Sequence, residues 1–565
     1  MWLHGTAHPA ETETETNTVM KDETQVVLGI DLGTTATKVV AVDGGYRVIS
    51  TGERPAPLRT GRNGEAVHDP ETVLAGVVEA VRESAGLCAA RGLSVAALSF
   101  SAALHTLLAL DSLGEPLTPA LSWADTRAAG IARRLRAPAS RRGTGSGRAG
   151  ISSGASIESA EADALHRATG TPVHSMAPLT KLAWFAAHEP ELVRRTASWC
   201  GLKDYVLSRF TGRLVTDLSC ASATGLLDMR TTRWHGPALD IAGVSADRLP
   251  ELVPPTAVFT LLPEAAAALG LPAGLPVVAG AGDGPLANLA VGATAPATAA
   301  LSLGTSGALR VVRDRPGVDE RCRVFCYYLA DGLWVLGGAV SNAGVVAQWA
   351  AESFGGVDVG DLLKEAAEVE PGAEGLIALP HLLGERAPWW DPEARGALIG
   401  LRRGHGRAHM TRAMVEGVGQ QLALVRDSLL AADAPITSVR ATRGCAAVRP
   451  LGGDRRRRAR DASGDHRRRR GLGLRCRAAG AACARCPALA DRPRAGCPRP
   501  PHGDPGPDGG AAAGGDPGAQ RAAVPTPARG AGAAPVTTAP ASRRSRTASA
   551  TVIRGSSASS ANATR

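Results

Sequence analysis

Two turns rich in glycine and threonine stand about 270 residues apart in this chain, and each follows a short apolar run. They occupy residues 31–38 (DLGTTATK) and 303–307 (LGTSG). Glycine lets the backbone approach a phosphate closely, and hydroxyl and amide groups can donate to its oxygens. One such turn could equally be a plain hairpin, but two of them predict a nucleotide held between two halves of the chain. The predicted phosphate-binding residues are Gly33, Thr34, Thr35, Lys38, Gly304, Thr305 and Ser306.

Two aspartates could support phosphoryl transfer. Asp31 ends the first apolar run and could hold Mg²⁺ through water, because hard cations prefer oxygen ligands. Asp283 lies in a glycine-flanked segment after another apolar run, at a strand end of the kind where α/β proteins bind ligands. A carboxylate there can accept the proton of a substrate hydroxyl as it attacks a phosphoryl group. We therefore expect Asp31 and Asp283 to be the catalytic residues and the metal ligands, although a lone turn aspartate would be the simpler interpretation.

The elements that must position these residues alternate between short apolar strands and amphipathic helices, which predicts an α/β fold. We expect two domains, at residues 25–272 and 273–442, each opening on a strand and a glycine turn. Residues 133–160 are dominated by Arg, Gly, Ser and Ala and predict a flexible insertion. The predicted strands are residues 26–30, 38–42, 96–100, 276–280, 299–303 and 436–442, and the predicted helices include 71–85 and 408–432.

The charge distribution changes abruptly at residue 443. Residues 443–565 hold 24 Arg and 7 Asp but no Lys, Glu or aromatic residue, whereas the whole chain carries only +10. The preceding part is therefore acidic, and the pI of about 9.4 belongs to the tail. Such a composition buries too little apolar surface to fold, so we expect a disordered tail. The basic pI accordingly gives no reason to expect a nucleic-acid partner.

The other signals favour a cytoplasmic protein. Residues 1–24 contain a Thr-Glu repeat without an apolar core, which predicts a disordered extension rather than a signal peptide. No run of 18 apolar residues occurs, so no membrane partner is expected. Five of the ten cysteines precede residue 443, lie among apolar residues, and are expected to be reduced thiols.

Several segments make the chain resemble the FGGY carbohydrate kinases, over residues 26–442. The resemblance implies two actin-like (ribonuclease-H-like) ATPase domains with an interdomain cleft, and ATP and Mg²⁺ as cofactors. Within the family, a Thr-Pro-x-His opening at residues 171–174 points to gluconate kinases. The segments are residues 99–105 (SFSAALH), 123–127 (WADTR), 170–184 (GTPVHSMAPLTKLAW), 283–288 (DGPLAN) and 384–391 (GERAPWWD).

The resemblance also implies roles for single residues. Asp283 would be the base, and Asp31 would support activity and the metal. Arg127 could pair with the carboxylate of gluconate, since guanidinium geometry suits a carboxylate, or equally form a structural ion pair with Asp125. Leu104 replaces the methionine that is more usual in its loop. The implied substrate-binding residues are Leu104, His105, Trp123, Asp125, Arg127 and Asp283.

The chain departs from the family after residue 442. Such kinases continue with a Gly-Gly-x-x-x-Ser-x-x-Trp loop around the adenine, but this chain continues with Arg443 and Gly444. Reading codons 443–454 one nucleotide later permits Gly-Gly-Ala-Leu-Arg-Ser-Ala-Pro-Trp-Ala-Ala-Thr, which restores that loop. We therefore hypothesise a one-nucleotide frameshift near codon 443, with an incomplete second domain and an out-of-frame tail at residues 443–565.

The sequence thus predicts an ATP-dependent kinase that converts D-gluconate to 6-phosphogluconate. One alternative is a kinase of xylulose or another sugar. Another is a catalytically defective nucleotide-binding protein, because the adenine loop is lost. Whether the chain forms a homodimer stays open.

Overall fold

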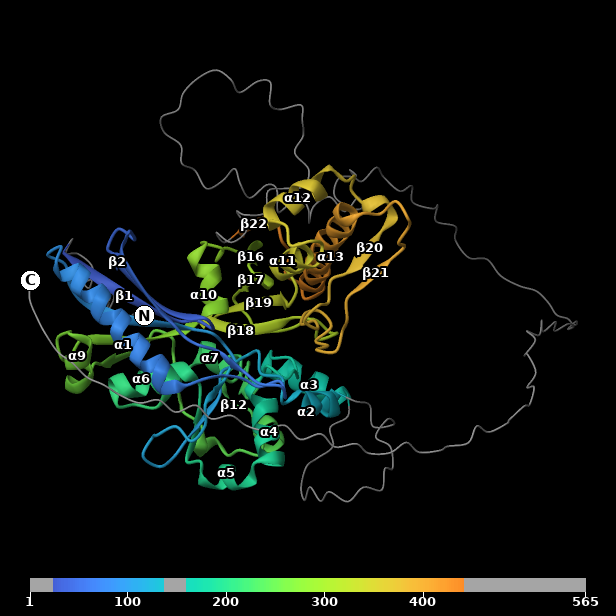
Figure 1. The fold of residues 1–565 in the computed structure, drawn as a ribbon. Coiled ribbons are helices and arrows are strands. Elements are labelled where there is room, and N and C mark those ends of the chain that lie inside the picture. Colours follow the sequence, from blue (N-terminus) through green and yellow to red (C-terminus); the bar gives the residue numbers. More distant parts are fainter. Residues whose placement is uncertain (1–23, 137–158, 442–565) are drawn as a thin grey trace, which may run out of the picture. The chain divides into compact units, whose positions relative to one another are not determined.

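The computed structural model describes residues 24–136 and 159–441, and two mixed β-sheets form its framework (Figure 1). The expected extension before Thr24, the tail from residue 443, and residues 137–158 of the expected insertion lie outside the described residues. The two flanks of that insertion are helical, in α2 (Ala129–Arg136) and α3 (Ser159–Thr169). The predicted α/β fold with two domains is confirmed.

The first sheet has six strands in the order β14-β15-β6-β1-β2-β3. Alternate side chains of β1, from Val26 to Leu32, are buried, as expected for an apolar run in a sheet interior. Helix α1 (Pro70–Ala89) packs on β2 and β3, and Asp69 caps it by accepting from the backbone N–H of Thr72. The strands are β1 (Gln25–Leu32), β2 (Ala36–Asp43), β3 (Val48–Pro55), β6 (Ser94–Ala102), β14 (Val258–Thr260) and β15 (Pro276–Gly282).

The second sheet has five strands in the order β18-β19-β17-β16-β22. Helix α13 (Arg407–Ala431) packs on β17 and β19 and buries Leu422, Val425 and Leu429 there, as its helical spacing predicts. Helices α11 (Gly344–Ser353) and α12 (Val359–Glu368) pack on α13 in turn (Figure 1). The strands are β16 (Thr298–Leu303), β17 (Gly307–Arg313), β18 (Phe325–Ala330), β19 (Leu333–Val340) and β22 (Ser438–Ala441).

The strand at the expected start of the second domain belongs to the first sheet. Strand β15 pairs in parallel with β6, with Val277 opposite Leu98, and α10 (Asp283–Ala290) follows it. The second sheet begins only at β16, so the expected boundary at residues 272/273 falls too early. An apolar run before a glycine turn has the same pattern whether it ends one sheet or begins the next.

Smaller elements fill the space around the two sheets. The remaining short strands are β4 (Arg59–Thr60), β5 (Ala66–His68), β7 (Leu108–Leu110), β8 (Ala120–Leu121), β9 (Ser198–Cys200), β10 (Val215–Asp217), β11 (Leu227–Asp228), β12 (Arg233–Trp234), β13 (Glu251–Val253), β20 (Ile377–Leu379) and β21 (Ala397–Ile399). The remaining helices are α4 (Pro178–His188), α5 (Pro190–Arg195), α6 (Leu202–Thr211), α7 (Leu218–Ser222), α8 (Gly236–Ala242) and α9 (Pro263–Leu269). In residues 24–136 and 159–441, no helix combines the length and apolar composition needed to cross a bilayer.

Candidate active site

Residues from both sheets line one cavity of about 280 Å³ that is partly open to solvent. The first sheet and its loops contribute Thr34, Leu104 and Asp283, and the second sheet contributes Arg310 among others. Trp123 follows β8, a strand of the small sheet β4-β5-β8. The complete lining is Thr34, Leu104, His105, Trp123, Met176, Asp283, Gly284, Ser302, Ser306, Gly307, Ala308, Arg310, Phe325, Tyr327, Ala339, Arg386 and Trp390.

Asp283 is the acidic residue of this lining. It is the first residue of α10, and its Oδ1 accepts from the backbone N–H of Gly284 at 2.7 Å. Although the residue is accessible from the cavity, burial raises the pKa of its carboxyl to about 6; Arg310 opposes that rise and Asp31 adds to it. A carboxylate with a pKa near 6 is ionised at neutral pH and accepts a proton more readily than an ordinary aspartate.

The strand that carries Asp283 is held closely against its neighbours. Gly280 has a φ of 72°, and a Cβ there would lie 1.7 Å from the carbonyl oxygen of Phe100 on β6, so only glycine fits. The buried Lys203 donates from Nζ to the carbonyl of Ala279 at 3.0 Å and forms an ion pair with Asp217 at 2.6 Å. These contacts fix the end of β15 from which Asp283 projects.

Asp31 lies at the end of β1, two strands from β15 in the same sheet. Its Oδ1 accepts from the hydroxyl of Ser101 at 2.8 Å. The two aspartates interact electrostatically, because the charge of Asp31 raises the pKa of Asp283. In the described residues no group of three His, Cys, Asp or Glu side chains is arranged to hold a metal. Asp31 does not line the cavity. Two carboxylates that interact electrostatically nevertheless suit Mg²⁺, which keeps several waters and takes one or two protein carboxylates.

The two glycine turns are the hairpins β1–β2 and β16–β17. In the first, the N–H of Gly33 donates to the carbonyl of Ala36 at 3.1 Å. In the second, the N–H of Gly304 donates to the carbonyl of Ser306 at 2.9 Å, and the carbonyl of Gly304 accepts from Gly344 at the start of α11 at 2.8 Å. Backbone hydrogen bonds therefore close both turns.

The predicted phosphate-binding residues differ in their access to the cavity, and Gly33 is half-buried in its turn without lining the cavity. Thr34 and Ser306 line the cavity, whereas Thr35, Gly304 and Thr305 are exposed in their turns. Lys38 is exposed on β2, opposite Asp31 in the strand register, and does not line the cavity.

The loop after β6 places Leu104 and His105 against the cavity. His105 has a φ of 68°, and its Nδ1 lies 2.7 Å from the carbonyl of Ala223. Because that carbonyl can only accept, Nδ1 carries the proton, and Nε2 remains an acceptor for a substrate hydroxyl. Burial lowers the pKa of His105 to about 3, so the ring is neutral. Both predicted substrate contacts in this loop thus line the cavity.

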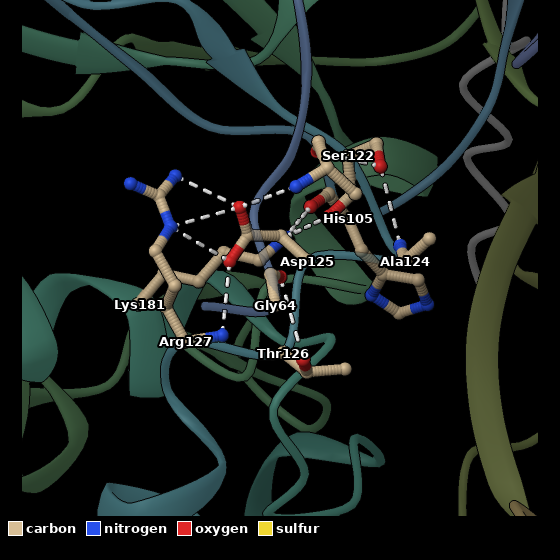
Figure 2. Close-up of polar contacts among 9 residues, drawn as sticks. Gly64, His105, Ser122, Ala124, Asp125, Thr126, Arg127 and Lys181 are labelled. Carbon is tan, nitrogen blue, oxygen red and sulfur yellow. Dashed lines mark hydrogen bonds and ion pairs between the residues drawn. The ribbon is translucent and has the colours of Figure 1, made fainter. Parts of the chain in front are cut away.

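Lys181 stabilises this loop through hydrogen bonds to backbone carbonyls, a role that the sequence did not reveal. Figure 2 shows its Nζ donating to the carbonyl of His105 at 2.6 Å and to that of Ser122 at 2.8 Å. Burial lowers the pKa of this buried amine to about 7. The contact joins the His105 loop to the segment that precedes Trp123. Its only sequence signal was its place within residues 170–184.

Trp123 lines the cavity, but Asp125 and Arg127 do not. The indole N–H of Trp123 donates to Thr34 Oγ1 at 2.9 Å, linking the predicted sugar and phosphate sides. Arg127 donates from Nε and Nη2 to the fully buried Asp125, at distances down to 2.8 Å, as Figure 2 shows. The structural ion pair, one of the two expectations for Arg127, is thus present.

The cations of the cavity are instead Arg310 on β17 and Arg386, which follows Glu385. The guanidinium of Arg386 stacks over the Trp123 ring at 5.3 Å from its centroid. Arg386 lies in the segment 384–391, but no role was predicted for it from the sequence. Arg310 was not predicted as a site residue. Strand alternation from Ser306 and Ala308 could have placed Arg310 on the cavity face.

Comparison with known proteins agrees with this architecture. Residues 26–290 match the N-terminal domain of the FGGY family of carbohydrate kinases, and residues 299–447 match its C-terminal domain. The fold and site thus define a carbohydrate kinase with two domains. The chain belongs to the FGGY family of carbohydrate kinases, phosphotransferases that generally use ATP with Mg²⁺.

Relatives with two different activities are similar to the chain. A gluconokinase of Bacillus subtilis (strain 168) is 36% identical over 436 residues, which cover 75% of this chain and 80% of the relative. The crystal structure of gluconate kinase from Lactobacillus acidophilus has a TM-score of 0.64 and 34% identity, covering 72% of this chain and 78% of that chain. Ligand-bound xylulose kinase from Lactobacillus acidophilus has a TM-score of 0.66 and 33% identity, covering 74% and 81%.

Proposed function

We propose that this chain transfers the γ-phosphoryl group of ATP to the C6 hydroxyl of D-gluconate, giving 6-phosphogluconate. The observation that carries the proposal is Asp283, an accessible carboxylate with a pKa near 6 in a cavity lined from both sheets. The gluconokinase relative and the segment at residues 171–174 support gluconate as the acceptor.

The roles of the residues follow from where they lie. Asp283 would accept the proton of the C6 hydroxyl, while Nε2 of His105 would accept from another substrate hydroxyl. The two glycine turns would hold the phosphates of ATP through backbone N–H and hydroxyl groups. Asp31 and Asp283 would hold Mg²⁺, which neutralises charge on the phosphates when bound.

A kinase of xylulose is the second candidate, because the xylulose kinase structure is about as similar as the gluconate kinase structure. A panel of D-gluconate, D-xylulose and D-ribulose, with ADP release as the readout, separates the two. We expect kcat/KM to be highest for D-gluconate. A higher value for either pentulose would contradict the proposal.

A catalytically defective nucleotide-binding protein is the third candidate, since the expected adenine loop is missing from the sequence. It predicts ATP binding in the millimolar range or weaker and no ADP release with any sugar. Titration calorimetry with a non-hydrolysable ATP analogue, run beside the substrate panel, distinguishes a defective chain from one with another substrate.

A further inference from the structure

We infer that Lys181 is a positioning residue for the sugar substrate, because it holds the His105 loop and the segment at Trp123 in one arrangement. The inference deepens the proposed function and rests on it for the part that His105 and Trp123 play in substrate binding. Lys181 does not line the cavity, so it acts through the residues that do.

Lys181 is a buried lysine whose N–H groups go to backbone carbonyls. It lies on α4 and is only 1% exposed. Burying an amine is costly unless its N–H groups are paired. Lys181 forms no ion pair within the described residues, and its Nζ donates to the carbonyls of His105 at 2.6 Å and Ser122 at 2.8 Å (Figure 2). Its pKa is about 7, and the neutral amine keeps two N–H groups, so both carbonyls have a donor in either protonation state.

The first of these carbonyls belongs to a residue in an unusual backbone conformation. His105 has a φ of 68°, in the left-handed region that a residue other than glycine adopts at a cost and keeps only where its surroundings stabilise it. Two contacts do so, one from Lys181 Nζ to the His105 carbonyl and one from His105 Nδ1 to the carbonyl of Ala223 at 2.7 Å. The first fixes the backbone and the second fixes the ring. Without Lys181, the backbone contact is lost and the loop can relax.

The second carbonyl belongs to the residue before Trp123. The carbonyl of Ser122 accepts from the backbone N–H of Asp125 at 3.1 Å as well as from Lys181. The indole of Trp123 lines the cavity, and its N–H donates to Thr34 Oγ1 at 2.9 Å. Lys181 therefore joins two segments, after β6 and after β8, that each place a side chain on the cavity.

A second residue of α4 contacts the same segment without reaching the cavity. Trp184 follows Lys181 by three residues, so both lie on one side of the helix. The guanidinium of Arg127 stacks over the Trp184 ring at 5.1 Å from its centroid, and it also pairs with Asp125. Because this anchor is independent of Lys181, we expect residues 122–127 to stay folded when the amine is removed, while the His105 loop loses its link to them.

The test is a double-mutant cycle in the full chain that combines Lys181→Met with His105→Ala. Methionine fills the space of the lysine stem but cannot donate to either carbonyl. Calorimetry measures the affinity for D-gluconate and, separately, for a non-hydrolysable ATP analogue. We expect K181M to weaken gluconate binding by roughly 10- to 100-fold, the loss of hydrogen bonds from a charged donor, with the ATP analogue within about twofold. The double variant should lose at least fivefold less than the product of the two single losses, because the two residues act as one unit.

Thr196→Val is the matched control for a loss of stability alone. Thr196 is 1% exposed, donates from Oγ1 to the carbonyl of Leu192 at 2.8 Å, and does not line the cavity. The substitution therefore also removes a buried hydrogen bond to a backbone carbonyl. T196V should lower the melting temperature and leave gluconate affinity within twofold. Combined with His105→Ala, its effect should be additive.

Three results would overturn the inference. The first is an unchanged gluconate affinity in K181M, and the second is an equal loss for gluconate and the ATP analogue, as general loosening would produce. The third is a cycle in which the losses from K181M and H105A multiply. Should K181M fail to fold, Lys181→Gln decides instead, because its amide keeps two N–H groups on a shorter side chain. A three- to tenfold loss confined to gluconate supports the inference, and no loss overturns it.

The same experiment separates this inference from the proposed function. Gluconate binding that depends on Lys181 through His105, without phosphorylation, would support the inference and reject the kinase proposal. Phosphorylation of gluconate with the same KM in K181M would do the reverse.

Discussion

Four strands have the same order in both sheets, but the strands added beyond these four differ between the sheets. Strands β3-β2-β1-β6 of the first sheet correspond to β19-β17-β16-β22 of the second, with the same parallel and antiparallel pairs. The first sheet adds β15, which ends just before Asp283, and the edge strand β14, whereas the second adds β18 beside β19. In the part of the chain that the structure describes, no strand of the second sheet follows β22.

The difference divides the chemistry between the sheets. The first sheet supplies both candidate acids, Asp31 and Asp283, whereas the second supplies Arg310 and the hydroxyl of Ser306. Neither sheet alone contains a base and a cation on the cavity. We therefore expect activity to depend on both sheets. An incomplete second domain should weaken ATP binding more than it impairs proton transfer to Asp283.

The largest effect should come from Asp283→Asn, which keeps the shape of the side chain but cannot accept a proton. We expect kcat for D-gluconate to fall by about 10²- to 10⁴-fold, the usual contribution of a general base. Affinity for ATP in the absence of Mg²⁺ should change little, because neither glycine turn is altered. Steady-state assays of ADP release measure both quantities.

Asp240→Asn is the control for this variant, since Asp240 is exposed on α8 and remote from the cavity lining. It should keep the activity of the unaltered chain. If kcat of D283N stayed within tenfold of that of the unaltered chain, Asp283 would not be the base. The proposed division of chemistry between the two sheets would then be wrong.

The next effect concerns the second sheet and the frameshift that we propose near codon 443. The coding DNA should be sequenced across codons 435–465, and a chain with the shifted frame should be expressed beside the chain as written. We expect the shifted chain to bind ATP at least tenfold more tightly, because it regains a Gly-Gly-x-x-x-Ser-x-x-Trp loop. Equal ATP affinity of the two chains would contradict the frameshift proposal.

Much of this comparison was predictable from apolar patterning. The runs around Val26, Val277 and Ala299, and the helical spacing from Met410 to Val425, marked elements that the structure confirms. The sheet to which β15 belongs was not predictable, because strand pairing is a long-range contact absent from local pattern.

Side-chain partners were harder to predict than elements. Asp283, Leu104, His105 and Trp123 line the cavity as expected, because each stands at a strand end or in the loop after one. Arg127 looked equally suited to a substrate or to Asp125, and only the buried position of Asp125 favours the ion pair. The surroundings of Arg310 were not predictable either, because its side chain passes Gly337 on β19, which is remote in sequence.

The dependence of activity on pH should test whether Asp283, which follows β15 of the first sheet, is the base. The pKa of Asp283 is raised to about 6, and the proposed base can accept a proton only in its ionised form. We therefore expect kcat/KM for D-gluconate to be constant above pH 7 and to fall tenfold for each unit below about pH 6. The residual activity of D283N should lack this acidic limb. An acidic limb that persists in D283N would assign the titration to another group.

The smallest effects should distinguish the two glycine turns. A Cβ on Gly33 would lie 2.8 Å from the carbonyl oxygen of Ala36, whereas the nearest atom to a Cβ on Gly304 is 3.9 Å away. Gly33→Ala should therefore distort the first turn, cost about 1–3 kcal/mol of stability, and raise the KM for ATP several-fold. Gly304→Ala should change both quantities little.

The second turn should instead be sensitive to a substitution in the helix that packs against it, α11. A Cβ on Gly344, at the start of α11, would lie 2.6 Å from the carbonyl oxygen of Gly304. We therefore expect Gly344→Ala to raise the KM for ATP about as much as Gly33→Ala, although residue 344 lies outside the turn. Thermal melts and ATP titrations of the three variants test this order. A larger effect for G304A than for G344A would mean that α11 does not hold the second turn, and that the sheets bind phosphate by different means.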